Sequence, residues 1–117
     1  MSPTAATERE PIPPGTLDML VLRTLAGAAS GELHGFEIAE AIQRGSRDVL
    51  QVEEGSLYPA LQRMLIKGWI AGEWGRTPEN RRARYYTLTA AGKKQLEREI
   101  ASYRRVAQAI ALILQPA

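Results

Sequence analysis

The sequence contains no cysteine and only one histidine, His34, among its 117 residues. The absence of cysteine excludes disulfides and thiolate metal sites, and a single imidazole cannot build a nitrogen-rich metal cage. We therefore expect no metal, no cofactor and a reducing cytoplasmic location. His34 stands before Gly35 at the expected start of a helix, with no catalytic partner near it in sequence. We interpret it as a helix-start or loop residue rather than a ligand or catalyst.

Long apolar runs and enzyme motifs are missing as well. No stretch reaches the roughly 18 consecutive apolar residues that a membrane span needs, and the N-terminal MSPTAATEREPIPP lacks the apolar segment of a signal peptide. There is no glycine-rich phosphate loop, and Ser56 does not lie in a Gly-x-Ser-x-Gly elbow, so an enzyme is the least favoured class. With 117 residues and 44% apolar content, the chain is expected to form a single soluble domain.

The net charge is small, but the charged residues are strongly segregated along the chain. The formal net charge is only +2, yet residues 1–62 carry four arginines against nine acids, and residues 63–117 carry eleven lysines and arginines against four acids. The two parts therefore balance at −5 and +7. A basic half on a nearly neutral protein indicates an anionic partner, because the local field attracts a polyanion. Solvated helix faces are the alternative explanation for part of these charges.

The first segments predict an arm followed by a buried helix. Residues 1–14 hold four prolines without periodicity, which predicts a disordered or extended arm. Thr16 offers an N-cap hydroxyl for a helix over residues 17–25 that is apolar almost all round. Its second apolar face, with Met19 and Leu22, predicts a subunit contact. A helix enclosed by its own domain is the open alternative.

Two further helices with a short connection give the outline of a helix-turn-helix. The second helix begins at His34-Gly35 and ends near Gly45, with a core face that we assign to Phe36, Ile38, Ala39, Ala41 and Ile42. The third covers residues 54–68, capped by Glu53 or Ser56 and stopped by Gly68. Its apolar positions recur at about 3.6 residues and leave an opposite polar face. The apolar set is Leu57, Leu61, Met64 and Leu65, and the polar set is Ser56, Pro59, Arg63 and Lys67.

A β-hairpin with a basic tip is predicted next. Residues 69–74 and 84–88 are rich in aromatic and β-branched side chains. Alternation along each strand places Ile70 with Trp74, and Tyr86 with Leu88, in the expected inward sets. The tip and its flanks carry the arginines Arg76, Arg81, Arg82 and Arg84, opposed only by Glu79. Guanidinium groups suit phosphate recognition, which we favour over a merely solvated loop.

The last segment, residues 89–114, predicts a long helix capped by Thr89. Apolar side chains recur along it at spacings of three and four residues, as in a heptad seam: Leu96, Ile100, Tyr103, Ala107, Ile110 and Leu114. Val106 and Ile113 widen this stripe. Its natural use is a dimer interface, and the alternative is a helix folded back on its own domain. Residues 15–88 would then form the main domain, and residues 89–117 a dimerisation helix packed on it.

These segments together resemble the PadR-type winged helix-turn-helix transcriptional regulators from residue 15 to about residue 114. The resemblance is carried by GTLDMLVLRTLA, HGFEIAEAI, EEGSLYPALQRMLIKGWIAGEWG and RRARYYTLTAAGKKQL. The single C-terminal helix is similar to the compact subgroup. The resemblance implies a mainly α fold with a small β-hairpin wing and a C-terminal dimerisation helix. It also implies a cytoplasmic homodimer that binds operator DNA, usually as a repressor. The chain departs from the family at Glu53 and Glu54, whose carboxylates favour the helix dipole but repel nearby phosphates.

The expected mechanism is non-catalytic binding of double-stranded DNA at an inverted repeat. The helix beginning near Ser56 would enter the major groove, where Gln62 and Arg63 match base-edge donors and acceptors. Ser56, Tyr58 and Lys67 would meet phosphate, with Pro59 on the same face; for Tyr58 this role is what the resemblance implies. The wing arginines named above would grip the backbone or an adjacent minor groove.

Two questions stay open at this stage. A winged domain used only for protein–protein assembly would share the fold and the heptad seam, but it would leave the wing arginines without a purpose. A small-molecule effector would need a cavity, for which Trp69, Trp74 and Tyr103 are candidate lining residues. Ordinary core packing is the favoured interpretation of these three side chains.

Overall fold

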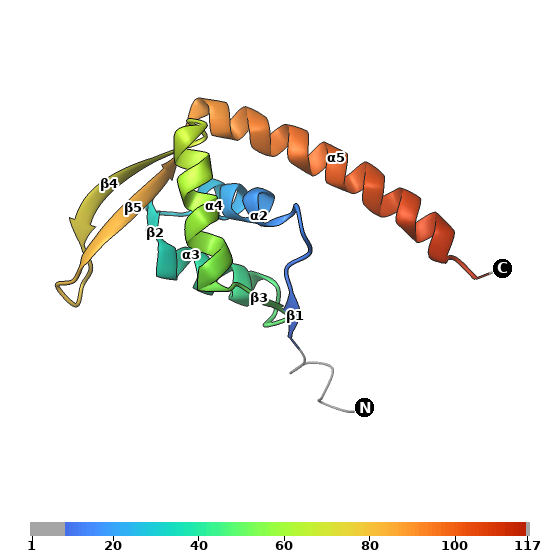
Figure 1. Ribbon diagram of the computed structural model, residues 1–117, viewed down its shortest axis with the longest axis horizontal. Coiled ribbons are helices and arrows are strands. Elements are labelled where there is room, and N and C mark those ends of the chain that lie inside the picture. The colour runs from blue at the N-terminus through green and yellow to red at the C-terminus, as the bar shows by residue number, and fades with distance from the viewer. Residues whose placement is uncertain (1–8, 117) are drawn as a thin grey trace.

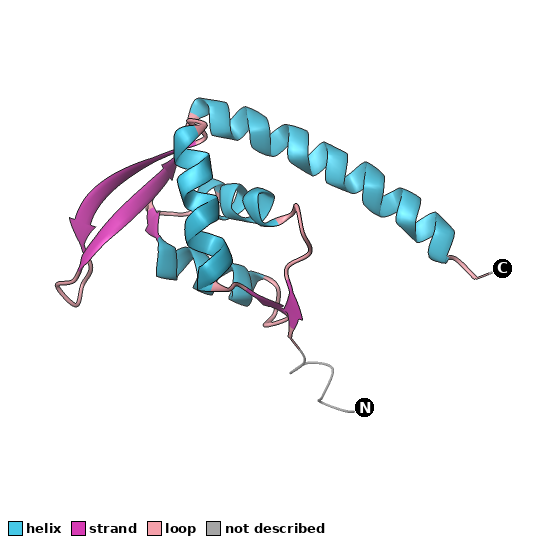
Figure 2. Ribbon diagram, viewed as in Figure 1, coloured by secondary structure: helices cyan, strands magenta, loops and turns pink. Residues whose placement is uncertain are grey.

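The computed structural model describes residues 9–116 and has the predicted architecture, mainly helical with a small β-hairpin (Figures 1 and 2). Its elements in chain order are β1 Glu10–Pro11, α2 Leu17–Ala26, β2 Leu33–His34, α3 Gly35–Gly45, β3 Leu50–Gln51, α4 Glu54–Ile66, β4 Ile70–Arg76, β5 Arg82–Leu88 and α5 Ala90–Leu114. The molecule measures 55 × 35 × 25 Å. The long dimension arises because α5 projects from one side of the helical body while the hairpin projects from the other.

The core is centred on α2, which α3, α4, the N-terminal part of α5 and the base of the sheet enclose. Val21 and Leu22 have no exposed surface, and Met19 is 9% exposed. The subunit contact predicted for Met19 and Leu22 is therefore wrong, because the chain's own core already covers both side chains. The Thr16 cap is also wrong in detail: the hydroxyl donates to the Pro13 carbonyl at 2.7 Å and makes no bond to the helix.

The N-terminal arm is extended where the structure describes it. Glu10–Pro11 pairs in parallel with Leu50–Gln51, and the Glu10 N–H donates to the Val49 carbonyl at 2.7 Å. The connection between the second and third helices, residues 46–53, therefore contains a short strand. Residues 1–8 of the predicted arm lie outside the described residues. The arm is thus tied to the segment that leads directly into α4.

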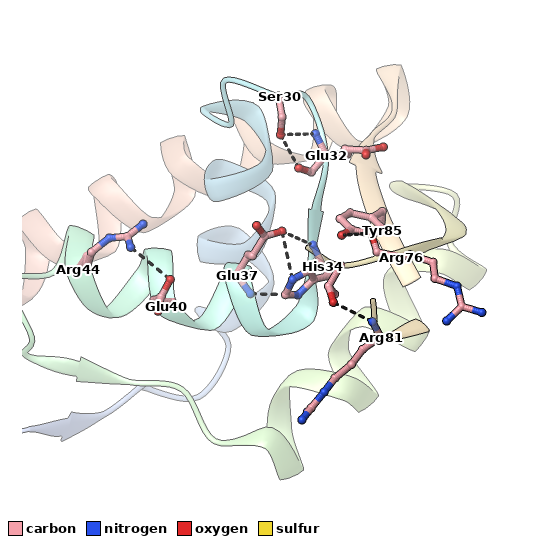
Figure 3. Close-up of polar contacts among 10 residues, drawn as sticks. Ser30, Glu32, His34, Glu37, Glu40, Arg44, Arg76, Arg81 and Tyr85 are labelled. Atoms are coloured by element: carbon pink, nitrogen blue, oxygen red, sulfur yellow. Dashed lines mark hydrogen bonds and ion pairs between the residues drawn. The ribbon is translucent and has the colours of Figure 1, made fainter. Parts of the chain in front are cut away.

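The start of α3 is fixed by a reciprocal cap. The His34 Nδ1 accepts from the Glu37 backbone N–H at 3.4 Å, and the Glu37 carboxylate accepts from the His34 N–H at 3.1 Å (Figure 3). These bonds satisfy two backbone donors at the helix end, which confirms His34 as a helix-start residue. Phe36 is 65% exposed, so its assignment to the core face was wrong. A helix turns by about 100° per residue, which puts Phe36 opposite Ile38.

The sheet is antiparallel, with strand order β2-β5-β4. The hairpin strands run longer than predicted, and only residues 77–81 form the tip. Pairing of Ile70 with Leu88 and of Trp74 with Arg84 confirms that Ile70 and Trp74 share a face. Ile70 is buried, but Trp74 is 59% exposed. The inward assignment of Trp74 was therefore wrong, because the hairpin extends beyond the core that covers its base (Figure 1).

Helix α5 belongs to the domain only at its N-terminal end. Thr89 caps it by accepting from the Gly92 N–H at 3.0 Å. Leu96 is 6% exposed, and Ile100 packs against the same core. The assignment of Leu96 to a dimer interface was therefore wrong, whereas Ile100 is only partly buried and stays a predicted interface residue. The remainder projects away (Figure 2), with Tyr103 50%, Ile110 53% and Leu114 76% exposed and Ala107 partly exposed.

Candidate nucleic-acid interface

Helix α4 presents an outer face because one side of it is fully used by the core. Leu57, Ala60, Leu61 and Met64 are at most 1% exposed. This spacing is that of a helix with one buried stripe. Glu53 is the N-cap residue without a side-chain cap bond, and Pro59 lies inside the helix. A proline there removes one early backbone bond, and the packing of the buried stripe compensates for it.

The outer face divides into two flanks. Tyr58 and Gln62 face the hairpin, and Ser56, Pro59 and Arg63 line a second, smaller groove of about 400 Å³ beside the N-terminal arm. On this arm side, the Arg63 Nη2 donates to the Asp18 carboxylate of α2 at 2.9 Å. The side chains of Arg63 and Asp18 are 55% and 23% exposed, so the pair lies at the surface. It holds the Arg63 guanidinium toward α2.

Tyr58 packs on the start of α3. A Cβ atom added to Gly35 would lie 2.8 Å from the Tyr58 hydroxyl oxygen, so only glycine leaves room for the ring. The Tyr58 side chain remains half-exposed. Burial raises the pKa of the neighbouring Tyr86 phenol, while Arg84 lowers it and Tyr58 adds a smaller upward effect. Tyr86 is buried and lines the same groove as Tyr58.

Lys67 lies at the other end of α4. Its ammonium stands 4.7 Å from the centre of the Trp69 ring, where the helix passes into β4. A helix rises about 1.5 Å per residue, so Lys67 is separated from Ser56 by more than three turns. The two residues do not form one phosphate site.

The wing arginines have different environments. Arg76 donates to the Asn80 carbonyl at 3.1 Å and so closes the tip. Arg81 donates its backbone N–H to the Thr77 hydroxyl at 3.1 Å, and its side chain extends into solvent (Figure 3). The guanidinium carbons of Arg82 and Arg84 lie 4.3 and 5.9 Å from the centre of the Trp74 ring. The tip therefore presents several positive charges against one acid, Glu79.

A groove of about 860 Å³ separates α4 from the hairpin. Its lining brings together five of the predicted contact residues, which are Tyr58, Gln62, Arg81, Arg82 and Arg84. Sequence reasoning missed His34, Phe36 and Glu79, which also line it, and named Trp74 only as a candidate lining residue of an effector cavity. The helical period would have identified Phe36, as described above. Such a groove, with aromatic walls and a basic rim, can hold an elongated anion.

Other kinds of site find no support in residues 9–116. No cluster of three or more metal-binding side chains occurs among them, and no helix there is long and apolar enough to cross a membrane. Neither groove is lined by Trp69 or Tyr103. Trp69 packs against the core as favoured, whereas Trp74 and Tyr103 are exposed, so core packing was wrong for these two.

The profile of the family described as "Transcriptional regulator PadR-like family" matches residues 22–98 of this chain. The chain belongs to the PadR-like family. It is thus a member of a family of transcriptional regulators, which confirms the resemblance carried by the sequence. The matched region runs from α2 through the first turns of α5 and contains the whole groove between α4 and the wing.

Solved structures share this PadR-like fold. A PadR family transcription regulator from Clostridium difficile is 29% identical, with a TM-score of 0.69, over 86% of this chain and 100% of that one. A transcriptional regulator from Clostridium thermocellum is 24% identical, with a TM-score of 0.76, over 86% and 95%. Bacillus subtilis PadR, solved in complex with operator DNA, is 24% identical, with a TM-score of 0.62, over 73% and 46%. The last two likenesses bear on the fold alone.

Proposed function

We propose that this PadR-like chain is a sequence-specific repressor that binds an inverted-repeat operator in double-stranded DNA as a homodimer. One observation carries the proposal: the exposed face of α4 and the basic wing border a common groove, with Gln62 and Tyr58 on one wall and Arg81, Arg82 and Arg84 on the other. Bacillus subtilis PadR, of similar fold, was crystallised with operator DNA, which supports the same class of ligand here. A cytoplasmic location and the absence of catalysis belong to the same proposal.

Within this proposal α4 is the recognition helix. Gln62 stands on its outer face, where an amide can bond an adenine edge in the major groove with donor and acceptor together. Arg63 is the weaker candidate for base contact because its guanidinium is already paired with Asp18 at 2.9 Å. Tyr58 and the wing arginines fit backbone contacts from the groove, while Ser56 and Pro59 would meet the strand on the arm side. Lys67 would reach only phosphates near the C-terminal end of α4.

The homodimer is proposed on the exposed half of α5. Four apolar side chains there recur at spacings of three, four and three residues, and each is at least 50% exposed: Tyr103, Val106, Ile110 and Ile113. Exposed apolar stripes of this length mark interaction surfaces. In a two-fold symmetric dimer, the same stripe of a second copy would cover this one. Two-fold symmetry would place two α4 helices about 34 to 36 Å apart, one DNA turn.

The first test asks which side chain of α4 recognises the DNA base sequence, and it compares Gln62→Ala with Arg63→Ala. Duplexes selected by the wild-type chain from a random-sequence library serve as probes. We expect Gln62→Ala to lower the preference for the selected duplex over a scrambled one by about tenfold, since a good bidentate base contact contributes roughly 1–3 kcal/mol of discrimination. We expect Arg63→Ala to change this ratio by less than about threefold. Fluorescence anisotropy of labelled duplexes measures both.

Arg44→Ala is the control for these variants, because Arg44 lies on α3 outside both grooves and pairs with Glu40 of the same helix. It should bind both duplexes as the wild type does. A larger loss of preference for Arg63→Ala than for Gln62→Ala would make Arg63 the reader and would mean that the Asp18 pair opens on binding. Selection that enriches no sequence would refute specific recognition.

The second test concerns the wing. Replacing Arg81 and Arg82 together by alanine should weaken the selected and scrambled duplexes by the same factor, because phosphate contacts carry no sequence information. Each lost phosphate contact removes one released counterion, so the slope of log affinity against log salt should become shallower by about 1.8. Titrations between low and moderate salt give this slope.

The matched control is the double variant Arg23→Ala/Arg44→Ala, which has the same net charge but changes exposed positions on α2 and α3 away from the groove. If both double variants changed the slope equally, only total charge would matter, and the wing would have no special role.

A further inference from the structure

Trp74 is an exposed tryptophan that the core does not use. Its side chain is 59% exposed. Ile70 lies on the same face of β4, four residues nearer the base of the hairpin, and is 2% exposed. Two guanidinium groups cover the ring instead. Arg82 lies 4.3 Å and Arg84 5.9 Å from its centre, both within the range of a cation–π contact. The Trp74 ring therefore contacts the arginines of the wing and is not part of the hydrophobic core.

The strand register makes this arrangement possible. Trp74 of β4 is paired directly with Arg84 of β5, and Arg82 precedes Arg84 by two residues in β5, so all three project from one face of the hairpin. Gly72, the preceding residue on this face, leaves the space that Arg84 occupies. A Cβ atom at Gly72 would lie 2.6 Å from the Arg84 Nε.

Stacking is the main restraint on both guanidiniums. Within residues 9–116, neither Arg82 nor Arg84 makes a side-chain hydrogen bond or ion pair, and the Arg84 Nε is buried without a partner. Arg76, in contrast, is held by the Asn80 carbonyl. The donors of Arg82 and Arg84 are therefore unused within these residues, while both groups lie against the Trp74 ring.

We propose that Trp74 is a positioning residue, which holds Arg82 and Arg84 against its ring so that their donors face the groove opposite Tyr58 and Gln62. The inference rests on the proposed DNA-binding function and assigns a role within it. Side chains that are already ordered lose less conformational entropy on binding, so phosphate contacts made by these two arginines become stronger. Trp74 itself need not touch the DNA.

The test compares Trp74→Ala with Trp74→Phe, using a duplex selected by the wild-type chain. Removing both stacking contacts should weaken binding about tenfold, whereas phenylalanine should keep affinity within about threefold, because it retains an aromatic face. Trp74→Ala should also make the salt slope shallower, although no charge is removed. The melting temperatures of both variants should match the wild type, since the ring lies outside the core. Nitrogen–proton spectra of the arginine Nε–H groups should show the ring-current shift of Arg84 lost in Trp74→Ala and kept in Trp74→Phe.

A double-mutant cycle separates positioning from direct contact. In an Arg82→Ala/Arg84→Ala background, Trp74→Ala should cause no further loss of affinity, because its effect passes through the two arginines. A full additional tenfold loss would show that the ring contacts DNA itself and would overturn the proposal. Wild-type affinity in Trp74→Ala would overturn it as well, while leaving DNA binding intact. If the wild-type chain bound no duplex at all, the proposed function would fail first and this role with it.

Discussion

Ile110→Asp is expected to disrupt the proposed homodimer, leaving a monomer, and to reduce affinity for the proposed operator by at least about 100-fold. Ile110 is the middle of the exposed stripe on α5 and is 53% exposed in the single chain. In a dimer it would be covered, and a buried unpaired carboxylate costs several kcal/mol. Once the subunits separate, each recognition helix binds alone, and the gain of 10² to 10⁴ in affinity that comes from linking two sites is lost.

Light scattering with size-exclusion chromatography measures the first effect and anisotropy the second. Gln108→Asp is the control, because it adds the same charge to the same helix but lies about 200° around it from Ile110. It should remain dimeric. Circular dichroism of Ile110→Asp should retain the helical signal of the domain, since Ile110 lies outside the core. A variant that stayed dimeric would place the interface elsewhere, and a monomer with unchanged affinity would show that the dimer is not the DNA-binding unit.

The periodic features of this fold could be predicted from the sequence because they depend on local spacing. The helical period identified the buried stripe of α4, and two-residue alternation put Ile70 and Trp74 on one face of the hairpin. Both rules describe which side of an element a residue occupies. They do not say how far the neighbouring element extends, and for that reason Trp74 was assigned to a core that ends before it.

Local spacing also failed to show where the apolar stripe of α5 leaves the core. A heptad pattern from Leu96 to Leu114 is continuous in sequence, yet its first two members pack on the chain's own core and the rest leave the domain. Nothing in the sequence indicates where the stripe stops packing on the chain's own core and becomes exposed. Contacts between distant segments could not be predicted from local spacing either. An example is the pair of Arg63 with Asp18, which lies 45 residues away in sequence.

The candidate site was predicted in its chemistry more than in its geometry. An amide on the exposed face of a helix and arginines at a hairpin tip were sufficient to indicate an anionic, elongated ligand. The packing of the wing beside α4 decides which of these side chains share a groove. Gln62 lines the groove beside the wing, whereas Arg63, the next residue in sequence, lines the other groove. The carboxylates of Glu53 and Glu54 remain exposed at the start of α4, where they favour the helix dipole and keep phosphates away from that end.

The junction that sets the direction of α5 should be the position most sensitive to a small change. The Thr89 hydroxyl donates to the Gly68 carbonyl at 2.6 Å and accepts from the Gly92 N–H, and the Thr89 N–H donates to the Trp69 carbonyl at 3.1 Å. Gly68 itself has a φ of 76°, in the left-handed region that glycine allows. The first turn of α5 is thereby held against the backbone that joins α4 to β4.

Gly92→Ala is expected to lower the free energy of unfolding by about 2–4 kcal/mol, because overpacking against backbone cannot be relieved by a rotamer change. An added Cβ atom would overlap the Trp69 carbonyl oxygen and approach the Leu88 Cδ1 to 2.8 Å. Urea denaturation followed by circular dichroism gives the change, best measured in the Ile110→Asp background so that dimerisation does not contribute to the apparent stability.

Gly45→Ala is the matched control, since Gly45 ends α3 and has no atom within 4 Å of the Cβ position. It should leave stability unchanged or raise it by up to about 1 kcal/mol, as expected when alanine replaces glycine in a helix. Equal stability of Gly92→Ala and the parent would mean that α5 can move away from Trp69 at little cost. In that case the junction would not fix the direction in which the exposed stripe of α5 leaves the domain. The spacing of the two α4 helices in the proposed dimer would then have to be set by contacts between the α5 helices themselves.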